Sequence, residues 1–196
     1  NTAALALDKA GIKVENGFIQ TNCRLETNVE GVYAVGDCTG KLMLAHAAMA
    51  MGETAAENAL GGDKCFKPEM SPSCAYVGPE FAGVGYTEER AKELGIKYTV
   101  GKYPTSGNGR SLAAQQTDGM IKVIVGEQYG EVLGVHILAP SATELIEEAA
   151  LAIRLEATVE EFTDTIHCHP TVAEAVRECF LESEGKAIHI PNRKKK

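Results

Sequence analysis

The residues with the clearest capacity for chemistry lie in one segment, residues 165–174, with the sequence Thr-Ile-His-Cys-His-Pro-Thr-Val-Ala-Glu. The segment places an imidazole, His169, just before a predicted helix and a carboxylate, Glu174, in the first turn of that helix. Pro170 forces an extended conformation on His169 and permits a cis peptide bond. A carboxylate held against an imidazole raises the pKa of the ring and fixes its tautomer, as a general acid/base requires. We therefore predict that His169 and Glu174 form a catalytic pair.

Glu174 also has a purely structural interpretation. Thr171 is the predicted cap of the last helix, and Glu174 stands at the third helical position, as in a capping box. Residues 141–144 and 158–161 carry the same pattern, which makes this interpretation a serious one. Because a carboxylate has two oxygens, one side chain can cap a helix and orient an imidazole at once.

The two histidines of this segment also suggest a metal. In an extended segment His167 and His169 would face the same side, with Cys168 between them, so they could form a two-point ligand set. A structural metal site needs more ligands, and the nearby sequence offers no third. We therefore predict no metal site.

A second group of candidate residues lies in the first third of the chain. Residues 31–36, Gly-Val-Tyr-Ala-Val-Gly, predict a buried strand that ends at Asp37, and residues 42–60 predict an alanine-rich helix. Ligands bind at the carboxyl ends of strands in open α/β sheets, where a helix amino terminus favours anionic groups. Asp37 is equally compatible with an ordinary turn. The candidate ligand-facing residues of the helix are Met43, Leu44, Ala45 and His46.

The elements that must position these residues fall into two parts, separated by a linker at residues 61–71 that contains two glycines and a proline, with a second proline directly after it. The first part is a strand–turn–helix unit of α/β type. In the second part strands precede helices, which predicts an antiparallel sheet with flanking helices, an α+β domain. Its predicted strands cover residues 75–86, 97–103, 120–125 and 132–138, with a hairpin turn at 126–130. Its predicted helices cover residues 87–94 and 141–155, a short stretch from 158, and residues 171–183.

Composition and charge exclude several classes of protein. The 196 residues carry a formal net charge of −8, which argues against nucleic acid and anionic membranes as partners. No apolar run approaches the roughly 18 residues of a membrane span. None of the six cysteines forms a Cys-x-x-Cys pair, and we expect reduced thiols in a cytosol-like compartment. The start at Asn1 suggests a piece of a longer protein, and we expect a disordered basic tip at residues 194–196.

Seven short motifs follow one another along nearly the whole chain: residues 27–37, 43–46, 79–80, 84–85, 87–89, 108–110 and 167–174. In this combination and order they resemble the carboxyl-terminal part of a flavin-dependent pyridine nucleotide–disulfide oxidoreductase. More narrowly, they resemble the dihydrolipoamide dehydrogenases, because of the His-x-His-Pro-Thr form at residues 167–171 and the extension that ends at residues 185–189. One departure is Val77-Gly78, where many relatives have Thr-x before the Pro-Glu.

The resemblance implies a role for each candidate residue. His169 would be the acid/base that takes a proton from a dithiol substrate, and Glu174 would hold it. Asp37 would hydrogen-bond the ribityl chain of FAD. Residues 43–46 would place a helix amino terminus against the pyrimidine edge of the flavin. NAD would be the electron acceptor.

The resemblance also implies an architecture and partners. Residues 1–65 would be the carboxyl-terminal portion of an incomplete FAD-binding domain, and residues 71–196 would be an interface domain for dimerisation. A second copy of the chain would pair through the residues after Ser71, so that His169 serves the disulfide and flavin of the other subunit. Further partners would be a dihydrolipoyl acyltransferase or a lipoyl carrier protein. The location would be the cytoplasm, or the mitochondrial matrix in a eukaryote.

Two motifs of such enzymes do not occur in the chain, Gly-x-Gly-x-x-Gly and Cys-x-x-x-x-Cys. We therefore expect this polypeptide by itself to bind FAD weakly or not at all and to show no dihydrolipoamide:NAD turnover. Two alternatives stay open. One is a non-catalytic dimerisation or docking module, and the other is a related flavin disulfide reductase with a different dithiol substrate.

Overall fold

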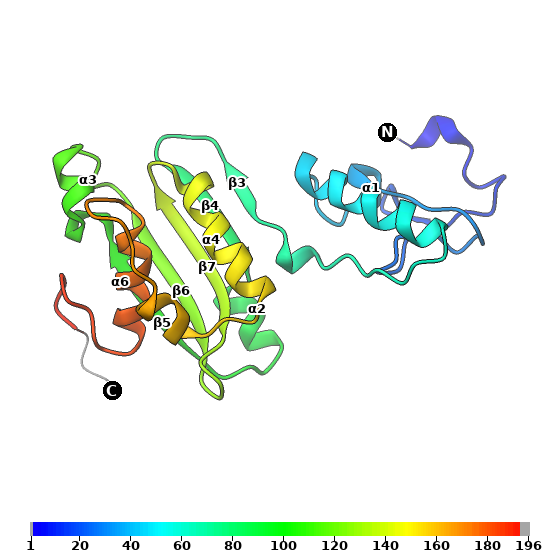
Figure 1. Ribbon diagram of the computed structural model, residues 1–196. Helices are drawn as coiled ribbons and strands as arrows, with labels where there is room; N and C mark the ends of the chain where they lie inside the picture. The colour runs from blue at the N-terminus through cyan, green and yellow to red at the C-terminus, as the bar shows by residue number, and fades with distance from the viewer. Residues whose placement is uncertain (1, 193–196) are drawn as a thin grey trace. The chain divides into compact units, whose positions relative to one another are not determined.

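The computed structural model describes residues 2–192, and the chain falls into two compact units, Asn1–Pro68 and Glu69–Lys196. Each unit has a hydrophobic core of its own. A short 3-10 helix, η3 (Pro68–Met70), stands at the boundary. Figure 1 traces the elements of both units in chain order, from blue to red.

The second unit is built on a five-stranded antiparallel sheet with the strand order β3-β4-β7-β6-β5. Because side chains alternate across a strand, Ile121 and Val123 of β6 are fully buried while Met120 is exposed. The strands are β3 (Ser73–Ala75), β4 (Glu80–Gly85), β5 (Tyr98–Pro104), β6 (Met120–Gly126) and β7 (Val132–Ala139).

Two helices cover one face of this sheet. α4 (Ala142–Arg154) packs on β4 and β7, and α6 (Glu174–Ser183) packs on β5 and β6. Figure 1 shows both helices in front of the strands. α5 (Val159–Asp164) is joined to α6 by the stacked rings of Phe162 and Phe180, whose centroids are 4.1 Å apart. Burial of one such ring contributes about 1.5–3 kcal/mol, so this layer fixes α6 firmly.

A glycine allows α6 to lie directly on β5. A Cβ atom at Gly101 would collide with the carbonyl oxygen of Cys179 and with the side chain of Val123. The helix backbone therefore approaches the strand more closely than any other residue would allow. The remaining elements of this unit are α2 (Glu88–Glu93), η4 (Thr105–Gly107) and α3 (Gly109–Ala113).

The predicted fold class, an antiparallel sheet with flanking helices, is confirmed for this unit. Each predicted strand has a counterpart, and the predicted strand 75–86 divides into β3 and β4 around the cis Gly78–Pro79 bond. The capping box at residues 158–161 is also confirmed: the Thr158 side chain accepts a hydrogen bond from the helix amides, and the Glu161 carboxylate accepts one from the Thr158 N–H.

The capping box predicted at residues 141–144 is wrong. Ser141 has a left-handed backbone, with φ of 60°, and its side chain caps no helix amide. The first turn of α4 is satisfied from another element, because the N–H and the hydroxyl of Thr143 both donate to Glu80 Oε2, at 3.1 and 2.8 Å. A tertiary contact has replaced the local cap.

The first unit contains one long helix, α1 (Ala45–Ala59). It confirms the helix predicted over residues 42–60, although α1 begins at Ala45 and not at residue 42. The buried strand predicted at residues 31–36 is wrong. Tyr33 forms only an isolated bridge with Glu26, because no strand among residues 2–192 offers this segment a continuous ladder. The other elements are η1 (Ala3–Leu5), β1 (Val14–Glu15), β2 (Phe18–Ile19) and η2 (Gly36–Thr39).

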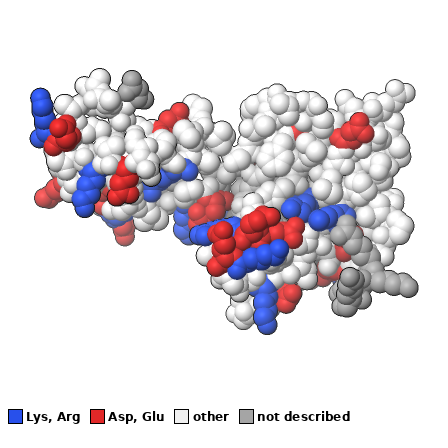
Figure 2. Space-filling view, turned by 180° about the vertical axis from the view of Figure 1, so that it is seen from behind, with Lys and Arg blue, Asp and Glu red and all other residues white. Residues whose placement is uncertain are grey.

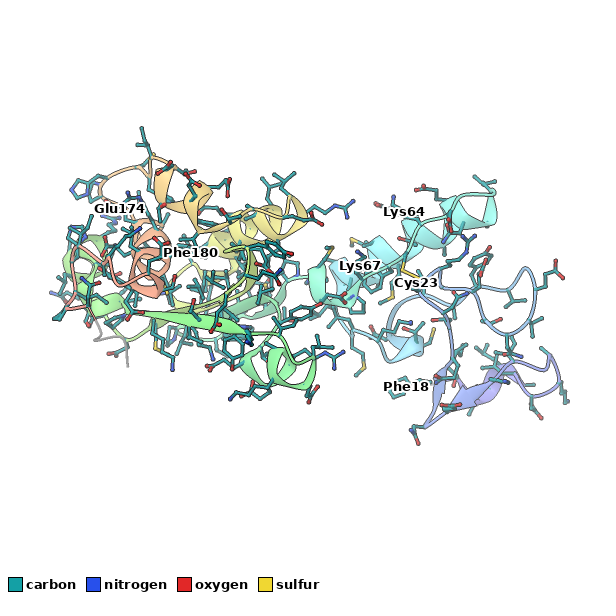
Figure 3. All side chains as sticks on the ribbon, turned by 90° about the horizontal axis from the view of Figure 1, so that it is seen from below. Phe18, Cys23, Lys64, Lys67, Glu174 and Phe180 are labelled. Atoms are coloured by element: carbon teal, nitrogen blue, oxygen red, sulfur yellow. A yellow bond between two sulfur atoms is a disulfide. The ribbon has the colours of Figure 1, made fainter. Side chains whose placement is uncertain are left out.

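The first unit is held together by a small core and a disulfide. Leu25 and Met51 are fully buried in that core. Cys23 and Cys65 form a disulfide, with Cα atoms 4.9 Å apart, which Figure 3 shows as a yellow bond beside the label of Cys23. The expectation of reduced thiols is wrong for this pair, because the fold joins two cysteines that lie 42 residues apart in the sequence. The described cysteines that form no disulfide are Cys38, Cys74, Cys168 and Cys179.

The surface carries charges of both signs. On the face shown in Figure 2, basic and acidic side chains are interspersed and form no large basic patch. Within residues 2–192, no helix combines the length and apolar character that a bilayer crossing requires. The predicted basic tip at residues 194–196 lies outside the described residues.

Candidate active site

The structure brings His169 and Glu174 together. The ring Nδ1 of His169 lies 2.9 Å from Glu174 Oε1, and Glu174 Oε2 accepts a hydrogen bond from the Thr171 N–H at 2.8 Å. Burial alone would raise the pKa of Glu174, but these two hydrogen bonds and the charge of the imidazole together hold that pKa below its ordinary value. The carboxylate therefore stays ionised and accepts from both partners.

The arrangement leaves one nitrogen of His169 available for proton transfer. An ionised carboxylate only accepts hydrogen bonds, so Nδ1 of the ring must carry the proton that it donates to Glu174. In the neutral ring the lone pair then resides on Nε2. The side chain of His169 is 80% exposed, whereas that of Glu174 is 26% exposed. A reacting group can therefore reach Nε2 without displacing the carboxylate.

Helix α6 begins later than the sequence predicts. It starts at Glu174, with Ala173 in the N-cap position and no side-chain cap, so the predicted role of Thr171 as the cap is wrong. The hydroxyl of Thr171 instead donates to the Cys168 carbonyl at 2.6 Å, which closes the turn around the cis His169–Pro170 bond. Only the part of the capping box made by Glu174 is present. Figure 3 labels Glu174 at this end of the helix.

A second loop supports this turn from the side. Asn108 is buried, and its Nδ2 donates to the Thr171 carbonyl at 3.0 Å. Its Oδ1 accepts from the Ser111 N–H and so caps α3. The motif at residues 108–110, which alone indicates only a turn, thus reaches the segment that carries His169.

Sequence reasoning missed two further histidine–carboxylate pairs. His167 Nε2 lies 3.0 Å from Glu148 Oε1 on α4. His189 Nδ1 lies 3.2 Å from Oε1 of Glu178, a buried residue of α6. Together with His169 and Glu174, they place three histidines of two different segments against carboxylates of two helices. Among the residues that line a hollow of about 240 Å³ here are His167, Glu174, Arg177, Glu178 and His189.

The signal that could have revealed part of this site is the spacing of carboxylates on the last helix. Glu174, Glu178 and Glu182 stand at intervals of four, on one face of α6. Each accepts a backbone N–H from outside the helix: Glu178 accepts those of residues 188 and 189 at 3.0 Å, and Glu182 accepts that of Lys102 at 2.8 Å. Glu178 and Glu182 are buried and Glu174 is half-buried, and such a row of carboxylates is expected only where donors converge on it.

The second group of predicted residues belongs to the first unit. Asp37 is exposed and lies in η2, directly after Gly36, whose φ of +75° and contact with Ala48 require a glycine. The amino terminus of α1 has no side-chain cap and no acidic residue in its first turn. No carboxylate of the first turn therefore opposes the helix dipole, which favours an electron-rich group at this end. The exposed residues here are Met43, Ala45 and His46, while Leu44 is half-buried and packs against the core.

The two histidines that suggested a metal do not act together. The side chain of His167 is 6% exposed and pairs with Glu148, whereas His169 pairs with Glu174. Within residues 2–192, no group of three or more histidine, cysteine, aspartate or glutamate side chains is arranged to hold a metal ion.

Solved structures share this architecture. The structure of LpdA from Mycobacterium tuberculosis matches 92% of this chain at 29% identity, with a TM-score of 0.85, and the chain covers 40% of it. The flavoprotein disulfide reductase RclA from Escherichia coli matches 92% of the chain at 26% identity, with a TM-score of 0.79, and the chain covers 42% of it. The fold is that of the dihydrolipoamide dehydrogenase-like flavoprotein reductases.

Two family models match the sequence. The model of the pyridine nucleotide-disulphide oxidoreductase dimerisation domain matches residues 71–180, and the pyridine nucleotide-disulphide oxidoreductase model matches residues 1–52. The chain belongs to the pyridine nucleotide-disulphide oxidoreductase family. The resemblance drawn from the motifs is thereby confirmed.

Among the curated relatives of this chain are proteins named dihydrolipoyl dehydrogenase. Dihydrolipoyl dehydrogenase from Thermus scotoductus is 48% identical over 98% of this chain, which covers 42% of that protein. The mitochondrial dihydrolipoyl dehydrogenase of Pisum sativum is 42% identical over 96% of the chain, which covers 38% of it. Leghemoglobin reductase of Glycine max is 41% identical over 94% of the chain, which covers 36% of it. The chain thus spans about two fifths of the length of these relatives.

Proposed function

We propose that this chain is the part of a dihydrolipoamide dehydrogenase that carries its acid/base histidine. The whole protein reoxidises dihydrolipoyl groups and passes the electrons through a disulfide and FAD to NAD. The observation that supports this most is the His169 Nδ1–Glu174 Oε1 pair at 2.9 Å. It occurs in a chain that is 48% identical to a protein named dihydrolipoyl dehydrogenase.

In this proposal His169 moves a proton. Its Nε2 takes the proton of a substrate thiol. The resulting thiolate attacks one sulfur of the redox disulfide, which breaks that S–S bond, forms a mixed disulfide with the substrate and releases the other sulfur as a thiolate. Glu174 stabilises the imidazolium through Nδ1 and keeps the ring in the correct tautomer. The exposure of the His169 ring lets the thiol approach it. The proton leaves Nε2 in the next half-reaction.

The residues of the first unit fit a flavin. FAD, when bound, supplies the two-electron chemistry between the dithiol and NAD. The proposal is supported by the exposure of the Asp37 carboxylate, which can accept a hydroxyl hydrogen bond. It is also supported by the amino terminus of α1, which has no side-chain cap and favours negative charge on a bound ring. The residues assigned to this contact are Asp37, Met43, Leu44, Ala45 and His46.

The proposal includes an architecture and partners. Residues 1–65 belong to a FAD-binding domain, and residues 71–196 form an interface domain that pairs with a second copy of the chain. The match of residues 71–180 to a dimerisation domain supports this assignment. A dihydrolipoyl acyltransferase or a lipoyl carrier protein presents the substrate, in the cytoplasm or the mitochondrial matrix.

The isolated 196-residue chain is proposed to be inactive and to bind FAD weakly or not at all. Its sequence contains neither a Cys-x-x-x-x-Cys redox pair nor a Gly-x-Gly-x-x-Gly fingerprint. An assay of dihydrolipoamide:NAD turnover with this polypeptide alone tests the statement. Measurable turnover contradicts it.

The test of the catalytic proposal is His169→Gln in the full-length protein that contains this chain. Glutamine can still donate to Glu174 but cannot take a proton. We expect kcat/KM for dihydrolipoamide to fall about 10²–10⁴-fold, with the dimer intact. His136→Gln is the matched control, because this half-buried histidine of β7 lies outside the candidate site, with its Nε2 3.1 Å from the Tyr86 carbonyl oxygen. Full activity of His169→Gln refutes the acid/base role.

A docking role is favoured by a different observation. A groove of about 310 Å³ lies between α4 and α5. It is lined by the exposed side chains of Leu151 and Leu155 and rimmed by carboxylates, among them Glu156 and Glu161. A basic segment with an apolar anchor complements this surface. If docking is the sole function, Leu151→Ser weakens partner binding while His169→Gln changes nothing.

A related reductase that acts on a different dithiol is the remaining alternative. Nε2 of His169 can take a proton from any thiol that approaches it, so the geometry of the pair with Glu174 does not select the substrate. A panel of dithiols, tested on the full-length protein at equal concentration, decides the point. The proposal expects the highest kcat/KM with dihydrolipoyl groups.

A further inference from the structure

The ring of His167 is held between two oxygen acceptors. Its Nδ1 lies 3.1 Å from the Thr165 carbonyl oxygen, and its Nε2 lies 3.0 Å from Glu148 Oε1. A carbonyl oxygen cannot donate, and an ionised carboxylate cannot donate either. Both ring nitrogens must therefore carry hydrogen for both bonds to form. This geometry selects the imidazolium, a cation with two directed donors.

The surroundings of His167 support that assignment. Its side chain is 6% exposed, so water cannot easily replace either partner. The hydrogen bond to Glu148 raises the pKa of the ring, which outweighs the opposing effects of burial and of the Arg177 charge on α6. The Nε of Arg177 itself donates to the Thr163 carbonyl at 2.9 Å. Asp164 and Glu174 also line the hollow next to the ring.

The pair of His167 and Glu148 joins the loop that carries His169 to helix α4, which is packed on the sheet. Glu148 lies in the middle of α4, which packs on β4 and β7. Only Cys168 separates His167 from His169, so fixing the first ring fixes the start of the turn that carries the second. On its other side the turn is held by Glu174 of α6. The loop is thus held by one carboxylate of α4, that of Glu148, and by one carboxylate of α6, that of Glu174.

We propose that His167 and Glu148 are a positioning pair, which holds the loop of His169 against α4 so that the His169 ring meets Glu174 in one orientation. His167 itself touches no reacting group in this proposal. The inference rests on the proposed function only for its kinetic consequence. The structural consequence is independent of it, because the tautomer and orientation of the His169 ring can be measured without catalysis.

The first experiment measures the ring nitrogens of the histidines by NMR in the 196-residue chain. In wild type we expect His167 to titrate at a higher pH than an exposed histidine, and neutral His169 to carry its proton on Nδ1. In Glu148→Gln we expect the pKa of His167 to fall and His169 to populate both neutral tautomers. Glu147→Gln is the matched control, since it removes the same charge from an exposed neighbour on α4.

Either of two results overturns the proposal. One is an unchanged His169 tautomer in Glu148→Gln, with a spectrum equal to that of Glu147→Gln. The other is loss of the folded spectrum in both Glu148→Gln and His167→Gln, which assigns the pair a general structural role. His167→Gln is the second variant because glutamine removes the charge but retains a donor for one of the two oxygens.

The second experiment uses the full-length protein and separates this inference from the proposed function. Misplacement of a catalytic group by about 1 Å can lower the rate roughly 10²-fold. We therefore expect kcat/KM for the dithiol to fall about 10–100-fold in Glu148→Gln. The KM for NAD should be unchanged. If His169→Gln retains activity, the proposed function fails while the NMR result still stands. If His169→Gln is inactive and Glu148→Gln equals Glu147→Gln, the positioning role fails alone.

Discussion

Reduction of the Cys23–Cys65 disulfide should loosen the first unit by an amount that the structure sets. The two cysteines lie 42 residues apart in the sequence. In the chain-entropy model, closing a loop of that length removes about 13 cal/mol/K from the unfolded chain, or about 4 kcal/mol at 25 °C. Both cysteines are exposed, so a soluble reductant can reach them.

The folded geometry of this unit should survive reduction. The Phe66 N–H donates to the Cys23 carbonyl at 2.8 Å, and Asn58 Nδ2 donates to the carbonyls of Arg24 and Lys64 at 3.0 and 2.8 Å. These bonds join the same two segments as the disulfide. The loss should therefore appear as easier opening of α1 and its neighbours, without a new structure.

Hydrogen exchange of the α1 amides, with and without a dithiol reductant, measures this opening. A change of about 4 kcal/mol corresponds to roughly 10³-fold faster exchange of the best-protected amides. The double variant Cys23→Ser, Cys65→Ser should exchange fast under both conditions, whereas Cys74→Ser should respond to reductant as wild type does. Equal protection in oxidised and reduced wild type would refute the reasoning.

Three further predictions concern stability. Phe180→Ala removes the fully buried ring by which α6 stacks on Phe162 of α5. It should lower the free energy of unfolding by about 3–5 kcal/mol, measured by urea denaturation of the second unit. Gly36→Ala puts a Cβ on a residue with φ of +75° and should cost about 1–3 kcal/mol, seen as a lower melting temperature of the first unit. His167 has a raised pKa in the folded chain, so its contribution to stability is complete below the unfolded pKa of about 6.5 and is lost as pH rises through the folded pKa. The urea midpoint of wild type should therefore exceed that of Glu148→Gln by more at pH 6 than at pH 9, and an equal difference at both would contradict this.

Features that depend on near neighbours in the chain could be predicted from the sequence. The strands β5, β6 and β7 follow from their apolar pattern and from the hairpin residues between the last two. The capping box at residues 158–161 needs only residues three apart. His169 and Glu174 are five residues apart, so the start of one helix is enough to bring them together.

Features that depend on contacts between distant segments could not be predicted. Glu148 meets His167 across 19 residues, because α4 and the loop before α6 lie side by side only in the folded unit. Cys23 meets Cys65 across 42. The strand expected at residues 31–36 fails for the same reason, since an extended segment becomes a strand only when a neighbour supplies its ladder. The local pattern is present, but no strand within residues 2–192 pairs with it along its length.

The most direct test of the central claim is the pH dependence of kcat/KM for dihydrolipoamide in the full-length protein, for wild type and Glu174→Gln. If Glu174 holds His169 as the acid/base, removal of the carboxylate charge should leave the imidazolium that forms during proton transfer without its ionised partner at Nδ1. We predict a fall of about 10–100-fold in kcat/KM across the pH range measured. An unchanged rate and an unchanged profile would contradict the claim.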